Sequence, residues 1–389
     1  MLRRLGVQTA GESHGRGVFA TLTGLPAGVP LDLDAVNARL ALRQAGFGRS
    51  SRQQLEHDQL DVLAGVHKGR STGAPLLLAV WNRDDSLPDK PSLHRPRPGH
   101  ADLAGGQKYD QADMRPVLER ASARETAARV AAAGVVASLL DPLGIDVLGY
   151  VSALAGQAAK PPSVRAGLPG LRRRRDRSSF HCVDSAVEAS WKRHVTAARK
   201  AGDTLGGVVE VQARGVPPGL GSLQGFETRL DARVGAAMLS IQAFKAVELG
   251  EGLEAAALPG SQVHDAVGRP GPEGPKRPSN RAGGLEGGMS NGEALLVRGF
   301  MKPLATLRQP LPSWDFTAKR PDQAHFERSD VTAVPSAAIV AEAMVLLVVA
   351  DALLEKTGGD TLSEVRRALT AHRRVVARRF GTGGAAKRS

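Results

Sequence analysis

Cysteine and aromatic residues are scarce in this sequence. Cys182 is the one cysteine among 389 residues, so an internal disulfide cannot form and a disulfide-stabilised secreted scaffold is excluded. Aromatic residues make up only 4% of the chain. Single-stranded nucleic acids bind on aromatic stacking platforms, and this chain has few of them.

Long apolar runs are also missing. The first residues lead into polar, glycine-rich sequence without the apolar core of a signal peptide. The most apolar stretch, residues 343–354, contains Asp351 and is shorter than the roughly 20 apolar residues that a membrane-spanning helix needs. We therefore expect a buried helix there, and a soluble, cytoplasmic protein without membrane contact.

Positive charge is abundant. Lys and Arg total 52 against 39 acidic residues, which gives a formal net charge of +13. Such an excess attracts anions, whether nucleic acid, acidic lipid or phosphorylated metabolites, and does not choose among them. The length, with a hydrophobic content of 42%, suffices for one large domain or two ordinary ones.

Three segments carry helix signals. Residues 122–140 begin with a capping-box pattern, SARE, and continue as an Ala- and Val-rich run to a proline and a glycine. Residues 230–249 show apolar positions at near-helical spacing and precede Gly250. Residues 335–356 begin with a proline that suits a first helical turn.

Short strand-like runs bounded by glycine and proline lie between the helices. They span residues 18–22, 60–66, 75–80, 207–213 and 294–300. Because strands and long helices do not alternate regularly, an α+β fold is favoured over a parallel doubly wound sheet.

We expect a single catalytic domain over residues 1–371. Two stretches look like additions to it. Residues 156–180 are rich in proline and arginine, with the run 172–175 in what we expect to be loops, and resemble an insertion. Residues 372–389 form a basic tail without acidic residues, which predicts disorder.

Two histidines lie in glycine- and proline-rich segments. His14 lies in GESHG at residues 11–15, where glycines let the backbone turn sharply. His100 lies in RPRPGHAD at residues 95–102, with two arginines close by. A histidine titrates near neutrality and can donate a proton beside an anion. Taken alone, the first segment is more often a polar turn, and the second is equally well explained as a rigid solvated loop.

Other segments offer anion-binding groups. Arg43, Arg49 and Arg52 are separated by glycines that would let several guanidinium groups converge on one ligand, although a charged surface is the default interpretation. Arg120 and Ser122 stand where a helix N-terminus would attract phosphate, although the same capping pattern serves any helix.

A further stretch, residues 280–292, is dense in glycine, which favours close backbone approach to a ligand. It matches neither the dinucleotide-binding nor the P-loop pattern. Each motif is weak alone.

Together the motifs resemble the chorismate synthase family over nearly the whole chain. The resemblance rests on AGESHG at 10–15, GLPAG at 24–28, RPGHAD at 97–102, LERASARET at 118–126, GDTLGG at 202–207, AGGLEGGM at 282–289 and RSDVTAVP at 328–335. It implies a 1,4-elimination of phosphate and the C6 hydrogen from 5-enolpyruvylshikimate 3-phosphate, with reduced FMN required. It also implies a β–α–β sandwich, with helices between antiparallel sheets, assembled as a homotetramer.

The resemblance implies roles for individual residues. His14 would protonate the leaving phosphate, His100 would protonate the reduced cofactor, and Asp330 would accept a proton near flavin N5. The cations that hold the substrate would be Arg43, Arg49, Arg52, Arg97, Arg124 and Arg328. The residues that hold FMN would be Arg120, Ala121, Ser122, Gln242, Ala243, Gly287, Lys302, Pro303, Leu304, Ala305, Thr306 and Arg328. No metal site is expected.

The chain departs from the family pattern at three of these positions. Leu304 stands where small or hydroxyl residues are usual, Ala121 where serine is common, and Gln242 where asparagine is frequent.

NADPH could reduce the flavin directly, but we expect an external flavin reductase to supply the reduced flavin. The alternatives are a basic nucleic-acid-binding protein and a flavoprotein of this fold that has lost the elimination.

Overall fold

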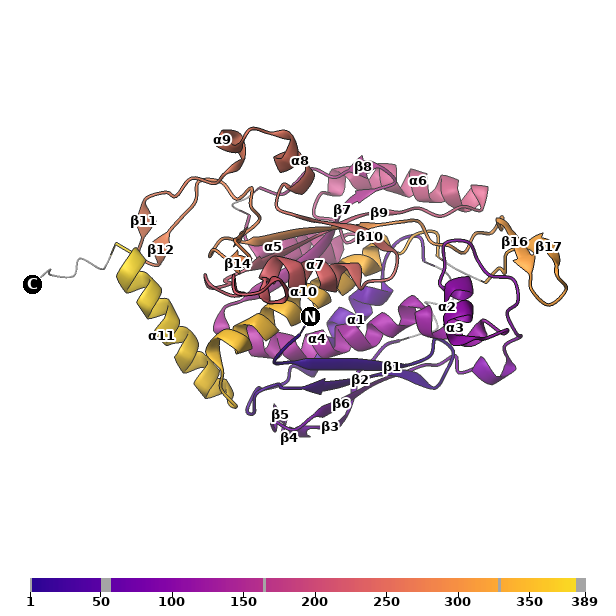
Figure 1. Cartoon of the computed structure of the whole chain (residues 1–389), viewed down its shortest axis with the longest axis horizontal. Coiled ribbons are helices and arrows are strands. Elements are labelled where there is room, and N and C mark those ends of the chain that lie inside the picture. The colour runs from indigo at the N-terminus through magenta and orange to yellow at the C-terminus, as the bar shows by residue number, and fades with distance from the viewer. Residues whose placement is uncertain (1, 50–56, 164–165, 328–329, 383–389) are drawn as a thin grey trace, which may run out of the picture.

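Two antiparallel sheets enclose a layer of helices in the computed structural model (Figure 1). The structure describes residues 2–49, 57–163, 166–327 and 330–382. Helices α4 (Thr126–Leu140) and α10 (Val334–Thr357) occupy the middle of this layer. The arrangement confirms the predicted α+β sandwich.

The first sheet has four strands in the order β1, β2, β6, β3, and each neighbouring pair is antiparallel. The strands are β1 (Gly6–Gly11), β2 (Gly17–Thr23), β6 (Leu76–Trp81) and β3 (Asp61–Ala64). Alternate residues of β2, such as Val18, Ala20 and Leu22, are buried, and this strand and β6 pack against α4. The period of two is that of a sheet with one covered face.

The second sheet has five strands in the order β10, β15, β9, β7, β8, also antiparallel. The strands are β10 (Phe244–Leu249), β15 (Leu295–Met301), β9 (Gly207–Arg214), β7 (Asp146–Leu154) and β8 (Gln157–Ala158). Helix α10 packs against β7 and β9 of this sheet and against α4, so it joins the two halves of the sandwich.

The remaining elements are shorter or lie outside the two sheets. The helices are α1 (Leu33–Gln44), α2 (Asp102–Tyr109), α3 (Arg115–Ala121), α5 (Leu168–Arg177), α6 (Glu188–Ala201), α7 (Leu230–Leu239), α8 (Gly252–Ala257), α9 (Gly260–Val263) and α11 (Leu362–Phe380), with short 3₁₀ turns at η2 (Leu87–Asp89), η3 (Ala123–Glu125), η4 (Asp141–Leu143), η5 (Ser185–Val187) and η6 (Phe226–Thr228). Four small hairpins complete the fold: β4–β5 (Val66–His67, Arg70–Ser71), β11–β12 (Pro270–Gly271, Gly274–Pro275), β13–β14 (Leu285–Glu286, Met289–Ser290) and β16–β17 (Pro312–Asp315, Arg320–Gln323).

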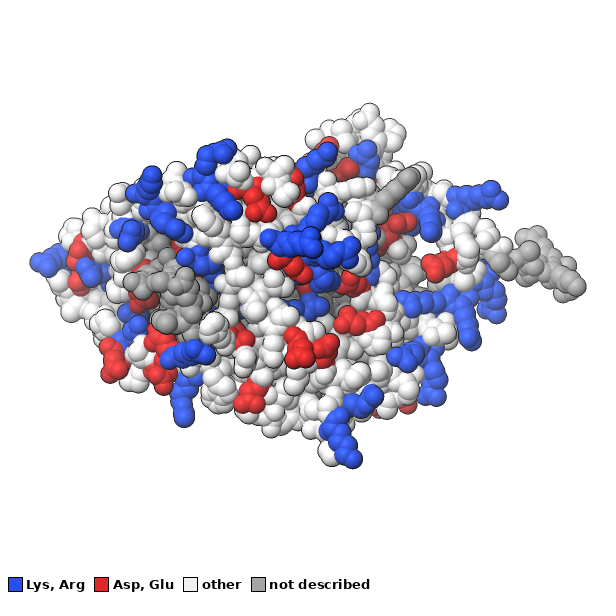
Figure 2. Space-filling view, turned by 180° about the vertical axis from the view of Figure 1, so that it is seen from behind, with Lys and Arg blue, Asp and Glu red and all other residues white. Residues whose placement is uncertain are grey.

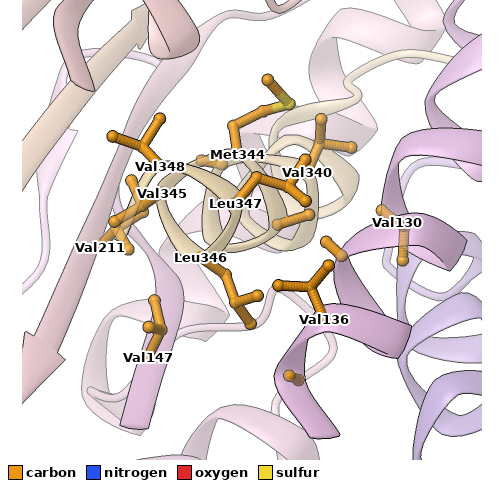
Figure 3. Packing of buried hydrophobic residues seen from close by; sticks show 14 of the residues in the cluster. Val130, Val136, Val147, Val211, Val340, Met344, Val345, Leu346, Leu347 and Val348 are labelled. Atoms are coloured by element: carbon orange, nitrogen blue, oxygen red, sulfur yellow. The ribbon is translucent and has the colours of Figure 1, made fainter. Parts of the chain in front are cut away.

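The core is built around α10, which is apolar on every side. Figure 3 shows its side chains pointing both toward Val130 and Val136 of α4 and toward the sheet residues Val147 and Val211. A helix that is apolar all round must be covered all round. By length and composition α10 could cross a membrane, but every residue of its most apolar window is buried inside the protein. The prediction of a buried helix there is confirmed.

The predicted second helix is wrong in its second half. Helix α7 ends at Leu239, and residues 244–249 form strand β10, paired with β15. Ala243 has a φ of 66°, in the left-handed region, and separates the two elements. Local apolar spacing did not reveal this break, because a short apolar run suits either a helix or a strand.

Three further expectations need correction. The predicted disordered tail from residue 372 lies in α11 as far as Phe380, and only residues 383–389 lie outside the described part. Helix α11 begins at a Thr361–Glu364 capping box, and His372 Nε2 lies 2.8 Å from the Pro218 carbonyl oxygen.

The arginine run at 172–175 lies in helix α5 rather than in a loop. Arg175 is buried against Glu342 of α10, at 2.9 Å, and Arg172 pairs with Asp146 at 2.5 Å. The run is therefore partly used for internal ion pairs.

The predicted capping box at residues 122–125 forms only in part. Ser122 accepts from the Arg124 backbone N–H, at 3.3 Å, and so caps the short turn η3 before α4. The Glu125 side chain does not reach back to the cap. It pairs with Arg129, one turn further along, at 3.0 Å.

Candidate active site

The loop between β1 and β2 carries His14. Gly11 begins the turn with a φ of 102°, and a Cβ at this position would lie 2.2 Å from the Gly17 carbonyl oxygen, so only glycine fits. Asn82 holds the loop, because its Nδ2 donates to the carbonyl oxygens of Ser13, at 3.2 Å, and Gly15, at 2.7 Å. The result is a tight turn that buries His14 to 5% exposure.

Glu119 of α3 fixes the orientation of His14. Its carboxylate accepts the His14 backbone N–H at 2.8 Å and lies 2.9 Å from Nδ1. Burial would raise the pKa of Glu119, but the hydrogen bond from His14 and the nearby charges lower it below its usual value. With Nδ1 held, Nε2 lies on the opposite side of the ring, where Asp84 Oδ2 is 3.9 Å from it.

His100 is held in the same manner by Asp102. Its Nδ1 lies 2.5 Å from Asp102 Oδ1, and Oδ2 of the same carboxylate accepts from Arg97 Nε at 2.8 Å. Burial would raise the pKa of Asp102, but the hydrogen bonds from His100 and Arg97 lower it well below its usual range. A buried carboxylate thus orients each of the two candidate histidines.

Predicted substrate-binding arginines converge on two carboxylates. Asp58 lies between Arg43 Nη2, at 2.6 Å, and Arg124 Nη1, at 2.5 Å, and Arg49 Nη1 lies 3.0 Å from Asp330 Oδ2. Burial lowers the pKa of Arg43, and the neighbouring Arg124 and Arg49 lower it further although Asp58 opposes them. Several guanidinium groups therefore share one small, largely buried region.

Arg124 connects this arginine cluster to the His14 loop. Its Nε donates to Asn82 Oδ1 at 2.7 Å, and Asn82 in turn holds the carbonyl groups around His14. Ser122 Oγ lies 3.2 Å from Ser13 Oγ, beside His14. The histidine and the cations that would hold an anionic ligand are therefore neighbours in space.

Several predicted cofactor residues line a second side of this region. Arg120 Nη2 donates to the Thr9 carbonyl oxygen at 2.9 Å, and Gln242 Nε2 donates to Glu125 Oε2 at 3.1 Å. Within the described part of the chain, Gln242 Oε1 is buried and has no hydrogen-bond partner. A buried amide oxygen without a donor is costly, and a ligand N–H group at this position would satisfy it.

Lys302 connects these residues to His100. Its backbone N–H donates to the Ala243 carbonyl oxygen at 3.0 Å, and its Nζ donates to the Gly99 carbonyl oxygen at 2.8 Å. Burial and the nearby Lys245 lower the pKa of Lys302. Thr306 Oγ1 accepts from Arg97 Nη1 at 2.8 Å, so segment 302–306 packs on the His100 loop.

The remaining predicted residues have varied placements. Ala121 ends α3 beside Ser122. Pro303 and Ala305 lie in the 302–306 segment, and the Leu304 carbonyl oxygen accepts from Thr204 Oγ1 at 2.7 Å. Gly287 lies in the β13–β14 turn, where the Gly288 carbonyl oxygen accepts from the backbone N–H that begins α7. Gln242 follows the opposite end of this helix, so Gly287 is set apart from the others. Arg52 and Arg328 lie outside the described residues.

Sequence reasoning missed the acidic and amide residues that hold the site. These are Asp58, Asn82, Asp102, Glu119 and Glu125. Three of them, Asp102, Glu119 and Glu125, lie inside motifs that were recognised, but nothing in the local sequence shows that Glu119 faces a histidine 105 positions earlier. Among the described residues, His, Cys, Asp and Glu form no group of three that could hold a metal ion.

The chain is similar to known proteins over nearly its whole length. A family model described as chorismate synthase matches residues 5–354. The chorismate synthase of Moorella thermoacetica is 49% identical, with 97% of this chain and 99% of the relative covered, and that of Thermobifida fusca is 47% identical, with 96% and 98% covered. A chorismate synthase crystal structure superposes with a TM-score of 0.80 at 38% identity, covering 97% of this chain and 99% of that chain.

Proposed function

This chain belongs to the chorismate synthase family, a family of lyases in the shikimate pathway, and from this premise we propose that it converts 5-enolpyruvylshikimate 3-phosphate to chorismate with the help of reduced FMN. The reaction is a 1,4-elimination. The C–O bond to phosphate and the C6–H bond both break, a new double bond forms in the ring, and inorganic phosphate and a proton leave.

The convergence of buried cations beside an oriented histidine supports this proposal most strongly. The substrate carries two carboxylates and a phosphate, and Arg43, Arg49 and Arg124 offer fixed guanidinium groups within one region. Guanidinium groups match carboxylate and phosphate oxygens in paired geometry. Cations placed in advance where the phosphate departs also stabilise its developing charge. A set of exposed, unconnected arginines would provide neither this paired binding nor this stabilisation of the leaving phosphate.

Proton transfer is assigned to three side chains. His14 Nε2 donates a proton to the leaving phosphate, while Glu119 holds Nδ1 and prevents the ring from rotating. Asp330 accepts the proton that leaves C6, and its carboxylate faces Arg49. His100, held by Asp102, keeps a proton at the cofactor side of the site.

The residues present fit a flavin. Reduced FMN, when bound, supplies electron density to the reacting ring. Arg120, Ser122, Gln242 and Lys302 would hold it, together with Thr306, whose hydroxyl accepts from Arg97. The unsatisfied Gln242 Oε1 suits a ring N–H donor, and Lys302 with the nearby Lys245 suits a phosphate.

We also propose that the enzyme acts in the cytoplasm as a homotetramer, and that an external flavin reductase supplies reduced FMN at the expense of NADPH. A nucleic-acid-binding role has less support. Figure 2 shows basic side chains at many separate points of one face, with acidic side chains between several of them, whereas a nucleic-acid site would need a basic stripe.

The direct test is an anaerobic assay with the substrate and chemically reduced FMN, following chorismate by absorbance together with phosphate release. We expect turnover only with reduced flavin, and none with NADPH plus oxidised FMN unless a reductase is added. His14→Ala and Asp330→Asn should each lower kcat by about a hundredfold or more. Binding of flavin and substrate without any phosphate release by the unaltered protein would contradict the proposal.

A further inference from the structure

A turn formed by residues 178–182 supports the segment that carries Arg43 and Arg49. The Phe47 backbone N–H donates to the Ser179 carbonyl oxygen at 2.7 Å, and the Phe47 and Phe180 rings lie 5.4 Å apart. His181 Nε2 lies 2.9 Å from the Leu42 carbonyl oxygen. Because a carbonyl oxygen only accepts, Nε2 must carry the hydrogen of this bond.

His181 occupies a constrained position. It is 2% exposed, and its φ of 54° lies in the left-handed region that residues other than glycine seldom adopt. Such backbone conformations persist where the surrounding structure imposes them, and they concentrate near functional sites. The left-handed turn directs the imidazole at the last turn of α1, one residue before Arg43.

The turn has a rigid base. The Val151 backbone N–H of β7 donates to the His181 carbonyl oxygen at 2.9 Å. Just before the turn, Arg175 of α5 pairs with Glu342 of α10 at 2.9 Å and donates to the Gly149 carbonyl oxygen at 3.2 Å. The turn is thus attached to the second sheet and to the central helix, both of which are buried.

The segment that carries Arg43 and Arg49 is also bonded to the residues that follow Asp330. The Val331 backbone N–H, next to Asp330, donates to the Gly48 carbonyl oxygen at 2.9 Å, and Ser336 Oγ donates to the Arg43 carbonyl oxygen. Arg43 then reaches Asp58 at 2.6 Å. A shift of the α1 end would therefore move the guanidinium groups of both Arg43 and Arg49.

We propose that His181 is a positioning residue for the substrate-binding arginines, acting through its hydrogen bond to the Leu42 carbonyl oxygen and the 178–182 turn. This inference rests on the proposed function, because it assumes that Arg43 and Arg49 bind the substrate. It also assigns a role to the end of the 156–180 stretch and the turn that follows it.

The test compares His181→Leu, which removes the N–H donor at similar size, with His181→Gln, whose amide can place an N–H near the position of Nε2. His181→Leu should raise KM for the substrate roughly tenfold while the Kd for FMN stays unchanged, and His181→Gln should return KM to within about threefold of the unaltered protein. His372→Leu is the matched control, since it removes a ring-to-carbonyl hydrogen bond at Pro218, and its KM should not change.

The outcomes separate the two proposals. If the unaltered protein makes no chorismate with reduced FMN, the proposed function fails whatever the variants do. If the unaltered protein is active and folded His181→Leu keeps its KM, the positioning role is overturned. Equal KM values for the Leu and Gln variants, both raised, would also overturn it, since packing and not the hydrogen bond would then matter. Should His181→Leu not fold, His181→Asn replaces it: asparagine tolerates the left-handed backbone but its amide is too short for Leu42.

Discussion

At the scale of single residues, buried carboxylates hold the functional groups in place. Glu119 orients His14, Asp102 orients His100, and Asp58 lies between two arginines. Hydrogen bonds and nearby cations keep the pKa of Glu119 and of Asp102 below their usual values despite burial. These carboxylates therefore stay ionised through the neutral range, where they can accept hydrogen bonds from the imidazole rings.

Replacing Glu119 by glutamine should lower kcat by about ten- to a hundredfold while FMN binding is kept. The amide removes the negative charge beside His14 and one of its two acceptor oxygens, so the ring loses its fixed orientation. Anaerobic turnover and flavin titration measure the two effects. Glu12→Gln, an exposed change in the same loop, is the control and should leave kcat within about twofold. An equal loss in both variants would show that the loop, and not the Glu119–His14 contact, was disturbed.

At the scale of elements, Glu342, one of two buried acids in α10, joins three arginines. Its Oε2 lies 2.9 Å from Arg175, and its Oε1 pairs with Arg39 and lies 3.9 Å from Arg172. These come from α1 and α5, so the acid fastens both helices to the central one. Burial would raise the pKa of Glu342, but the three arginines lower it to about 2.

Glu342→Gln should destabilise the protein by about 3–5 kcal/mol at neutral pH, because it leaves buried arginines without their counter-charge. Because the folded-state pKa of about 2 lies below the ordinary glutamate value of 4.5, the stabilisation that ionised Glu342 provides is complete above pH 4.5 and is lost as pH falls toward 2. Urea unfolding of both proteins across this range should show the difference shrinking in acid.

The control for Glu342 is Glu355→Gln, near the end of the same helix. Glu355 pairs with Arg233 at 2.8 Å and Arg3 at 3.3 Å but is 34% exposed, so its loss should cost about 1 kcal/mol or less. An unfolding free energy for Glu342→Gln that is no lower than that of Glu355→Gln would contradict the assignment.

At the scale of the whole molecule, the net charge of +13 favours a multiply charged anionic substrate. The site itself is a buried set of cations, while the surface carries both signs (Figure 2). A positive field raises the local concentration and association rate of anions, and salt screens it over a Debye length of about 10 Å at 0.1 M. Long-range attraction and local pairing should therefore differ in salt sensitivity.

KM for the substrate should rise several-fold between about 20 mM and about 0.5 M salt, while kcat changes by less than about twofold. Salt screens the long-range attraction of the anionic substrate toward the enzyme, but it screens the buried contacts of the bound substrate far less. Initial rates at fixed reduced FMN across a salt series measure both quantities. A KM that does not change with salt would show that net charge plays no part in substrate capture.

The sequence alone determined the elements whose character is local. Helix α10 could be predicted because the apolar residues 343–354 are stable in a folded protein when they are buried, and five strands followed from short runs bounded by glycine and proline. His14, His100 and the candidate arginines could be identified from motifs. Predictions failed where an element depends on a distant partner: strand β10 forms because β15 pairs with it, and α11 is ordered by contacts such as His372 with Pro218.

Only the tertiary structure decided which groups face one another. Glu119 meets His14, Asp58 meets Arg124, and His181 meets the end of α1 across separations of 105, 66 and 139 positions. Periodicity and motif spacing act over a few residues, within one turn or one strand. Contacts across the sandwich depend instead on how two sheets close over α4 and α10, and that geometry is set by packing of the whole chain.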